Sequence, residues 1–119
     1  MPDPGSTGSA SADLAALPKE IATQSLSSLV VILPREPALA AITHLAQNGR
    51  RLISWEGWVK FRDGTRAKSL SHGGSFALPR DRTKAAEVAS AAIEKTQRLW
   101  DRNPEYEGTT LYYGLTFGD

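Results

Sequence analysis

The sequence contains no cysteine, and this absence excludes several kinds of site. Disulfide frameworks, zinc sites with thiolate ligands, iron–sulfur clusters and cysteine nucleophiles all need the thiol side chain. The chain also has only 2 histidines, and its acidic residues show neither EF-hand nor H-E-x-x-H spacing. We therefore expect no metal site and no bound cofactor.

Long apolar runs are also missing. The longest strongly apolar run covers residues 29–33, whereas a membrane-spanning helix needs about 20 apolar residues. Residues 1–13 lack the basic and apolar regions of a secretory signal and consist mostly of small and polar residues. We expect a disordered tail at residues 1–13, a single domain at residues 14–119, a cytoplasmic location and no membrane contact.

The composition of the chain is that of one globular domain. It has 119 residues, of which 40% are hydrophobic and 23% are charged. A chain of this length buries about two-thirds of its unfolded surface. A single core can therefore form without disulfides.

The charged residues are unevenly distributed. Residues 50–84 carry nine Lys or Arg against three Asp or Glu, whereas the segments before and after them have net charges of −2 and −3. A basic central third can give one face of a compact domain a positive potential and so favour an anionic partner. A solvated hairpin without a binding role explains the same pattern.

The first half of the chain predicts a short helix, a buried strand and a longer helix. Pro18 suits the start of a short helix at residues 18–25. Residues 28–33 are apolar from residue 29 onward, partly β-branched, and end at Pro34, which is typical of a strand buried on both faces. A helix follows from Pro37 to the exit at Asn48-Gly49. Its expected core side chains are Leu39, Ile42, Leu45 and Ala46.

A β-hairpin is predicted at residues 52–70. Apolar and polar residues alternate over residues 53–61, and Asp63-Gly64 marks the turn. A two-residue loop would mix charged and apolar side chains on one face, whereas a three-residue loop at 62–64, with Gly64 left-handed in a bulge, separates them. This register predicts three cross-strand pairs: Phe61 with Thr65, Val59 with Ala67, and Trp58 with Lys68.

The second half of the chain predicts a long helix and a final strand. Residues 71–75 interrupt the second hairpin strand, and residues 76–78 resume it briefly before Pro79. The helix covers residues 83–102 and has an apolar arc of roughly 140°. The members of this arc are Ala85, Val88, Ala89, Ala92, Ile93, Thr96, Leu99 and Trp100. In the final strand, at residues 110–117, the apolar positions alternate, so the end of the chain should be structural.

The order strand, helix, strand, strand, helix, strand is that of a ferredoxin-like, or split βαβ, domain. We expect an α+β domain whose four-stranded antiparallel sheet has two helices on one face. The alternative is the helix, three strands, helix layout of double-stranded RNA-binding domains, whose second helix the segment Thr83–Glu87 with Ala91-Ala92 resembles. The strong strand at 111–117 has no place in that layout, so we favour the ferredoxin-like order.

The sheet face opposite the helices carries the main candidate site. Aromatic side chains among cations can anchor a protein interface or provide a stacking platform for single-stranded nucleic acid. RNA-recognition motifs carry their stacking aromatics on the first and third strands. In this sequence those strands are SLVVIL and TRAKSLS, which contain no aromatic residue. We therefore expect a non-enzymatic interaction module (an inhibitor, adaptor or subunit) that binds a protein partner or itself, with single-stranded nucleic acid as the alternative. The expected contact residues are Trp58, Lys60, Arg66, Lys68 and Tyr112.

Other candidate residues are weaker. His44 is expected to face solvent. His72 stands near Ser71 and Ser75, but no acidic residue adjoins it and a G-x-S-x-G motif is absent. Free backbone N–H groups and a helix start could also hold an anion, although an ordinary turn explains the same pattern. The residues of this weak anion site are Gly73, Gly74, Arg80, Arg82 and Lys84.

Overall fold

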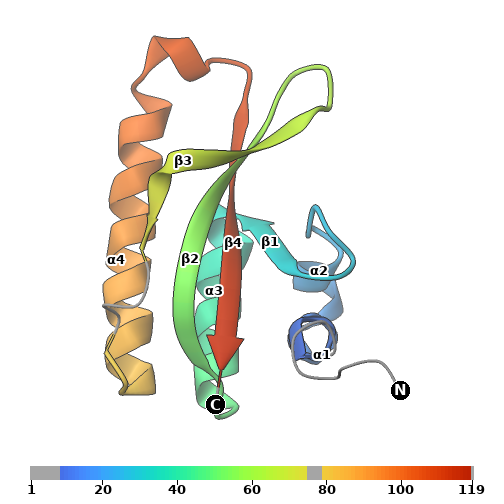
Figure 1. Ribbon diagram of the computed structural model, residues 1–119, viewed down its shortest axis with the longest axis vertical. Coiled ribbons are helices and arrows are strands. Elements are labelled where there is room, and N and C mark those ends of the chain that lie inside the picture. Colours follow the sequence, from blue (N-terminus) through green and yellow to red (C-terminus); the bar gives the residue numbers. More distant parts are fainter. Residues whose placement is uncertain (1–8, 75–78, 119) are drawn as a thin grey trace.

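A computed structural model gives the fold of residues 9–74 and 79–118. These residues form an α+β domain with a four-stranded antiparallel sheet (Figure 1). The elements in chain order are α1 (Ser9–Ala16), α2 (Lys19–Ala22), β1 (Val31–Pro34), α3 (Arg35–Gln47), β2 (Arg51–Lys60), β3 (Arg66–Gly74), α4 (Arg82–Asp101), the 3-10 helix η2 (Pro104–Tyr106) and β4 (Thr110–Gly118).

The strand order is β1-β4-β2-β3, so the last strand of the chain lies inside the sheet. Every pairing in this order is antiparallel. The connection through α3 passes over β4, and the connection through α4 passes over β2. The element order agrees with the sequence, but the ferredoxin-like arrangement is not confirmed, because β2 and β4 are the central strands and β1 and β3 are the edges.

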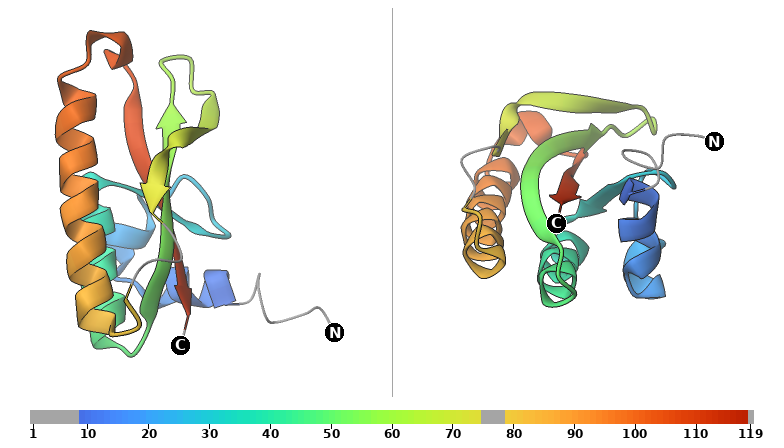
Figure 2. Two further views of the ribbon diagram at one scale, coloured as in Figure 1. Left: turned by 60° about the vertical axis from the view of Figure 1, so that its left-hand side comes forward. Right: turned by 60° about the horizontal axis from the view of Figure 1, so that its bottom comes forward.

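One face of the sheet packs against the helices and forms the core. Figure 2 shows α4, α3 and α1 side by side beneath the curved sheet. The core side chains alternate along β4, and along β2 from Trp55 onward, beyond the register shift between Leu52 and Ser54. The core residues of the sheet are Val31, Leu33, Leu52, Trp55, Val59, Leu111, Tyr113, Leu115 and Phe117, and those of α3 and α4 are Ala38, Ala41, Ile42, Leu45, Ala89, Ile93 and Trp100.

The predicted hairpin register is confirmed. The backbone N–H of Phe61 donates to the carbonyl of Thr65 at 2.8 Å, which closes a loop over residues 62–64. Gly64 has a φ of +89°, a left-handed conformation that glycine adopts without strain. Trp58 pairs with Lys68 and Val59 pairs with Ala67. The face-matching argument from the sequence was sufficient to find this register.

The long helix is confirmed, but its buried face is narrower than the apolar arc. Asp81 caps α4 by accepting hydrogen bonds from the backbone of Thr83 and Lys84 at 2.8 and 3.1 Å. Val88 and Leu99, which were expected in the core, are 49% and 58% exposed. Because α4 lies at the end of the helix row (Figure 2), neighbours cover only its sides toward α3 and the sheet.

Strand β1 starts at Val31, three residues later than expected. The hydroxyl oxygen of Ser27 accepts from the backbone of Leu29 and Val30 at 3.0 and 3.3 Å, and Ser25 donates to the carbonyl of Val30. These local bonds hold residues 25–30 in a loop instead of extending the strand. The loop leaves Leu29 and Val30 exposed.

The remaining boundaries differ for local reasons. Helix α3 starts at Arg35, before Pro37. Proline is tolerated in the first turn because a backbone N–H group there has no hydrogen-bond partner within the helix. Strand β3 continues to Gly74 through the expected break, where the register jumps from Gly57 opposite Ser69 to Glu56 opposite Gly73. Residues 70–72 therefore form a bulge. The short strand expected at 76–78 lies outside the described residues.

The N-terminal segment joins the domain earlier than expected. Helix α1 begins at Ser9, so the boundary expected between residues 13 and 14 falls inside a helix. Asp13 is only 6% exposed, and its carboxylate accepts hydrogen bonds from the Arg50 guanidinium at 2.8 and 3.1 Å. The same guanidinium lies 3.4 Å from the Phe117 carbonyl. This ion pair fixes α1 to the end of β4.

Candidate interaction surface on the outer face of the sheet

The outer face is the side of the sheet opposite the helices. Its side chains follow from the alternation along each strand and the register between strands. The residues of this face are Ile32 and Pro34 on β1, Ser54, Glu56, Trp58 and Lys60 on β2, Arg66 and Lys68 on β3, and Thr110, Tyr112, Gly114 and Thr116 on β4.

The register brings the expected contact residues together on this face. Trp58 is directly opposite Lys68 on one side and Tyr112 on the other. In the next row, Lys60 is opposite Arg66. Trp58 and Tyr112 are partly buried, and Arg66 and Lys68 are exposed. The five side chains thus form one continuous patch across three strands.

The indole of Trp58 lies across Gly114. A Cβ atom at position 114 would lie 2.9 Å from Nε1 and 3.2 Å from Cδ1 of Trp58, so only glycine leaves room for the ring there. Gly114 itself is buried. The pyrrole edge of the indole, at Nε1 and Cδ1, therefore lies against the central strand β4 at Gly114.

Glu56 fixes this position of the indole. Nε1 of Trp58 donates to one carboxylate oxygen of Glu56 at 3.1 Å, and the other oxygen lies 2.8 Å from Nζ of Lys68. The Lys68 and Glu56 side chains are 50% and 40% exposed, so solvent screens their attraction. The sequence-based set omitted Glu56 and Gly114. The i, i+2 spacing of Glu56 and Trp58 on an alternating strand was the available signal for Glu56.

The loop at residues 25–30 reaches the same face. The Arg66 guanidinium donates to the carbonyl of Leu26 at 2.7 Å, although the two residues are 40 positions apart. Ile32 is only 7% exposed despite its outer-face position, and both of its backbone polar groups bond to this loop, at Ser25 and Leu26. The loop therefore borders the outer face beside β1.

Lys60 is the least engaged of the three cations. Within residues 9–74 and 79–118 it forms no ion pair, and its cross-strand neighbour Arg66 has the same charge. Like charges opposite each other on neighbouring strands are unfavourable. With the half-exposed pair of Lys68 and Glu56, the patch keeps a net positive charge that an anionic group can compensate.

The residues of the weak anion site do not form a loop at a helix start. Gly73 and Gly74 belong to β3 and lie opposite Glu56 and Trp55. The backbone N–H groups of Thr83 and Lys84, in the first turn of α4, already donate to the carboxylate of Asp81. The same carboxylate lies at the positive end of the helix dipole. Arg80, Arg82 and Lys84 are exposed. This geometry gives the anion site no support.

His44 does not lie in the patch. His44 is partly buried, and its Nε2 lies 3.1 Å from the carbonyl oxygen of Ala16, so it links α3 to α1. The side chain of His72 lies outside the described part of the structure. The described residues contain no group of three or more acidic, histidine or cysteine side chains that could hold a metal ion.

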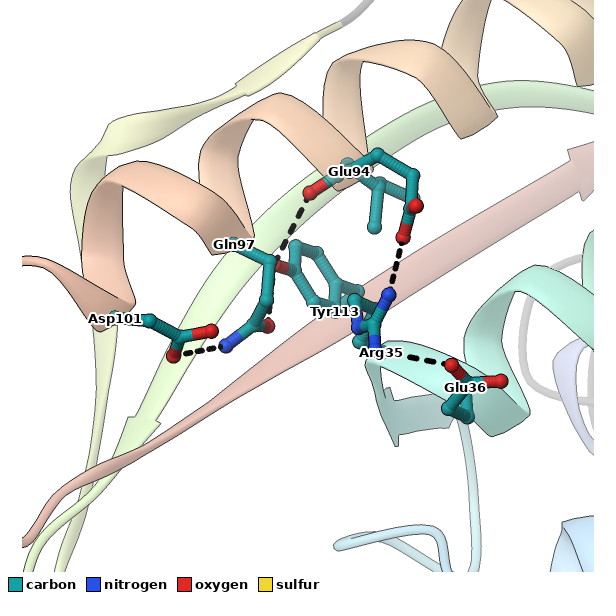
Figure 3. A network of polar contacts seen from close by, with 7 residues as sticks. Arg35, Glu36, Glu94, Gln97, Asp101 and Tyr113 are labelled. Carbon is teal, nitrogen blue, oxygen red and sulfur yellow. Dashed lines mark hydrogen bonds and ion pairs between the residues drawn. The ribbon is translucent and has the colours of Figure 1, made fainter.

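A second polar cluster joins α3 and α4 to the sheet (Figure 3). Arg35 pairs with Glu94 at 2.7 Å and with Glu36 at 3.0 Å. The hydroxyl of Tyr113 donates to Oε1 of Gln97 at 2.8 Å. Tyr113 is fully buried, and burial raises the pKa of its phenol above the ordinary value. The contacts of this cluster tie the start of α3 and the middle of α4 to the buried Tyr113 of β4.

Two further findings concern the chain as a whole and its relation to known proteins. None of the helices in the described ranges is long and apolar enough to cross a membrane. Comparisons of the chain with protein-family models, with curated proteins and with solved structures find no match. A proposal for the function therefore rests on the chemistry of the outer face itself.

Proposed function

We propose that this protein is a non-enzymatic interaction module that binds a protein partner through the outer face of its sheet. The observation that carries the proposal is the partly exposed indole of Trp58, held beside Gly114 by its hydrogen bond to Glu56. A side chain that is already fixed loses little conformational entropy when a partner covers it. Tryptophan is also among the commonest residues at the energetic centre of protein interfaces.

The surroundings of Trp58 supply the polar border of such an interface. Tyr112 flanks the indole on β4, and Lys60, Arg66 and Lys68 lie around it. An aromatic centre with charged residues at its border is the usual composition of a protein interface. The excess of cations favours a partner with acidic groups and disfavours a second copy of the same face.

Single-stranded nucleic acid is the second candidate, because a tryptophan among cations can stack a base and contact phosphates. One observation makes it weaker. The first and third strands, where RNA-recognition motifs carry their stacking aromatics, are edge strands here.

Affinity capture from the native lysate tests the proposal. The baits are the wild type, Trp58→Ala and, as a matched control, Phe61→Ala, which removes an exposed aromatic at the hairpin tip, outside the patch. We expect at least one protein to be enriched by the wild type and Phe61→Ala and lost with Trp58→Ala. If the folded Trp58→Ala bait captures the same proteins as the wild type, the proposal is wrong.

An oligonucleotide titration separates the second candidate. A labelled single-stranded oligonucleotide should show no saturable anisotropy change at 150 mM salt if the partner is a protein. Saturable binding that weakens steeply with salt and is lost in Trp58→Ala would show instead that the face binds nucleic acid, because counterion release makes such binding salt-dependent.

A further inference from the structure

The two edges of the sheet differ in how their backbone groups are satisfied. At the β1 edge, the N–H and C=O of Ile32 bond to the side chain of Ser25 and the N–H of Leu26. At the β3 edge, the hydrogen bond from Phe61 to Thr65 makes these two residues a hydrogen-bonded pair, and this fixes which of the following β2–β3 pairs are hydrogen-bonded. Bonded and non-bonded pairs alternate in an antiparallel ladder. The backbone N–H and C=O groups of Arg66 and Lys68 therefore point away from β2.

This outward-pointing edge is short and accessible. No segment within the described ranges pairs with β3 on the side away from β2. The bulge at residues 70–72 ends the regular ladder, so the regular edge consists of residues 66–69. An edge of this kind can accept one further strand through backbone hydrogen bonds.

The side chains at this edge specify the charge of the added strand. Arg66 and Lys68 lie on the outer face, and a strand added beside them would place its own outer-face side chains directly opposite. Pairing of β3 with β3 of a second copy would bring these cations together. The edge therefore disfavours self-association and favours acidic side chains.

The helix side of the same edge carries Ala67 and Ser69. Ala67 faces that side, and α4 packs against both β2 and β3. On the helical wheel, Val88 and Leu99 lie roughly 140–180° from Ala86 and Ser90, which line the groove toward α3. The exposed side chains of Val88 and Leu99 are thus on the flank of α4 that faces away from α3.

We propose that β3 binds an extended segment of a protein partner in which acidic and apolar residues alternate. The acidic side chains lie opposite Arg66 and Lys68 on the outer face, and the apolar ones lie beside Ala67 on the helix side. The segment pairs antiparallel to β3 through the backbone groups of Arg66 and Lys68. This proposal rests on the proposed function, because it names the kind of segment that the partner supplies.

Hydrogen exchange with a synthetic peptide tests the edge directly. The probe is an eight-residue peptide of alternating glutamate and valine, with an alternating lysine and valine peptide as control. We expect the glutamate peptide to slow amide exchange at Arg66 and Lys68, and the lysine peptide to leave both unchanged. Absence of protection at these two amides, or equal protection by both peptides, would overturn the proposal.

Backbone substitutions provide a second test. Lys68→Pro removes the outward N–H without breaking a bond to β2, and Lys68→Ala removes the same charge but keeps the N–H. We expect peptide affinity to fall about tenfold from Lys68→Ala to Lys68→Pro. If Lys68→Pro does not fold, peptides N-methylated on every glutamate or on every valine give the same information with the wild type: the first should not bind and the second should bind. Equal affinities in either comparison would overturn the proposal.

The outcomes separate this proposal from the proposed function. If the peptide leaves β3 unprotected while partner capture still depends on Trp58, the edge proposal fails and the proposed function stands. If the peptide protects β3 but no captured protein depends on Trp58, the proposed function fails. The binding of an acidic segment at the β3 edge then stands, but Trp58 is not a binding residue.

Discussion

Nε1 of Trp58 donates a 3.1 Å hydrogen bond to Glu56, the residue two positions earlier on the same strand and the same face. The second carboxylate oxygen of Glu56 is 2.8 Å from Nζ of Lys68 on the neighbouring strand. One carboxylate therefore orients both the aromatic ring and a cation of the proposed surface. This relationship leads to the first prediction.

Replacing Glu56 should affect binding more than stability. Glu56→Gln keeps an acceptor for Trp58, and Glu56→Ala removes it. We expect Glu56→Gln to change the free energy of unfolding by less than about 0.5 kcal/mol, because exposed ion pairs contribute little. Glu56→Ala should weaken partner binding by about tenfold, because the indole must then be ordered on binding. Partner titrations in which both variants match the wild type would show that the carboxylate does not orient the ring.

Gly114→Ala should displace the indole. The new methyl group would lie 2.9 Å from Nε1 of Trp58 and 3.1 Å from Cγ of Glu56. We expect a loss of about 1–3 kcal/mol in the free energy of unfolding, as for other overpacked sites. In Trp58→Ala the same substitution should cost much less. Urea unfolding of the four proteins in this double-mutant cycle measures the coupling. Additive effects would contradict the position of the ring over Gly114.

Tyr113→Phe should lower stability at neutral pH, and the difference should shrink in alkali. Loss of the hydrogen bond from the hydroxyl to Gln97 costs about 1 kcal/mol. Burial raises the pKa of Tyr113 above its ordinary value of about 10, so above that pH the unfolded chain releases a proton that the folded protein keeps. The stabilising contribution of the neutral phenol is therefore lost as the pH rises above about 10. Urea unfolding at pH 7 and pH 11 should show a smaller gap between the two proteins at pH 11. An unchanged gap would mean that the phenol titrates normally.

Asp13→Ala should release α1. The substitution removes both carboxylate contacts of Arg50 in a site where Asp13 is 6% exposed. We expect a loss of about 2 kcal/mol in the free energy of unfolding and faster amide exchange across α1, since hydrogen bonds between charged groups contribute more than neutral ones. Glu20→Ala on α2, which removes an exposed acid, is the control and should change neither quantity. Unaltered exchange across α1 in Asp13→Ala would show that the ion pair does not hold the helix.

The sequence predicted the features that depend on local pattern. Alternation identified β2 and β4, and the separation of charged from apolar side chains identified the three-residue loop that ends at Gly64. The pairing of Trp58 with Lys68 followed from that loop. These predictions were right because a hairpin register depends on residues that are close in the chain.

Features that depend on distant segments could not be predicted in this way. Alternation assigns residues to faces but does not say which strands are neighbours, so the insertion of β4 between β1 and β2 was not predicted. The contact between Trp58 and Gly114 depends on that insertion. Val88 and Leu99 are apolar and match the helical period, and only the position of α4 at the end of the helix row explains their exposure.

The role of Trp58 as the anchor is tested most directly by the dissociation constant of the purified partner, measured by titration calorimetry. We expect Trp58→Ala to raise this constant by about 30-fold or more, equivalent to about 2 kcal/mol. Phe61→Ala should change it by less than about twofold, within the range of a residue outside the contact centre. A folded Trp58→Ala protein that binds the partner as tightly as the wild type would contradict a binding role for the outer face.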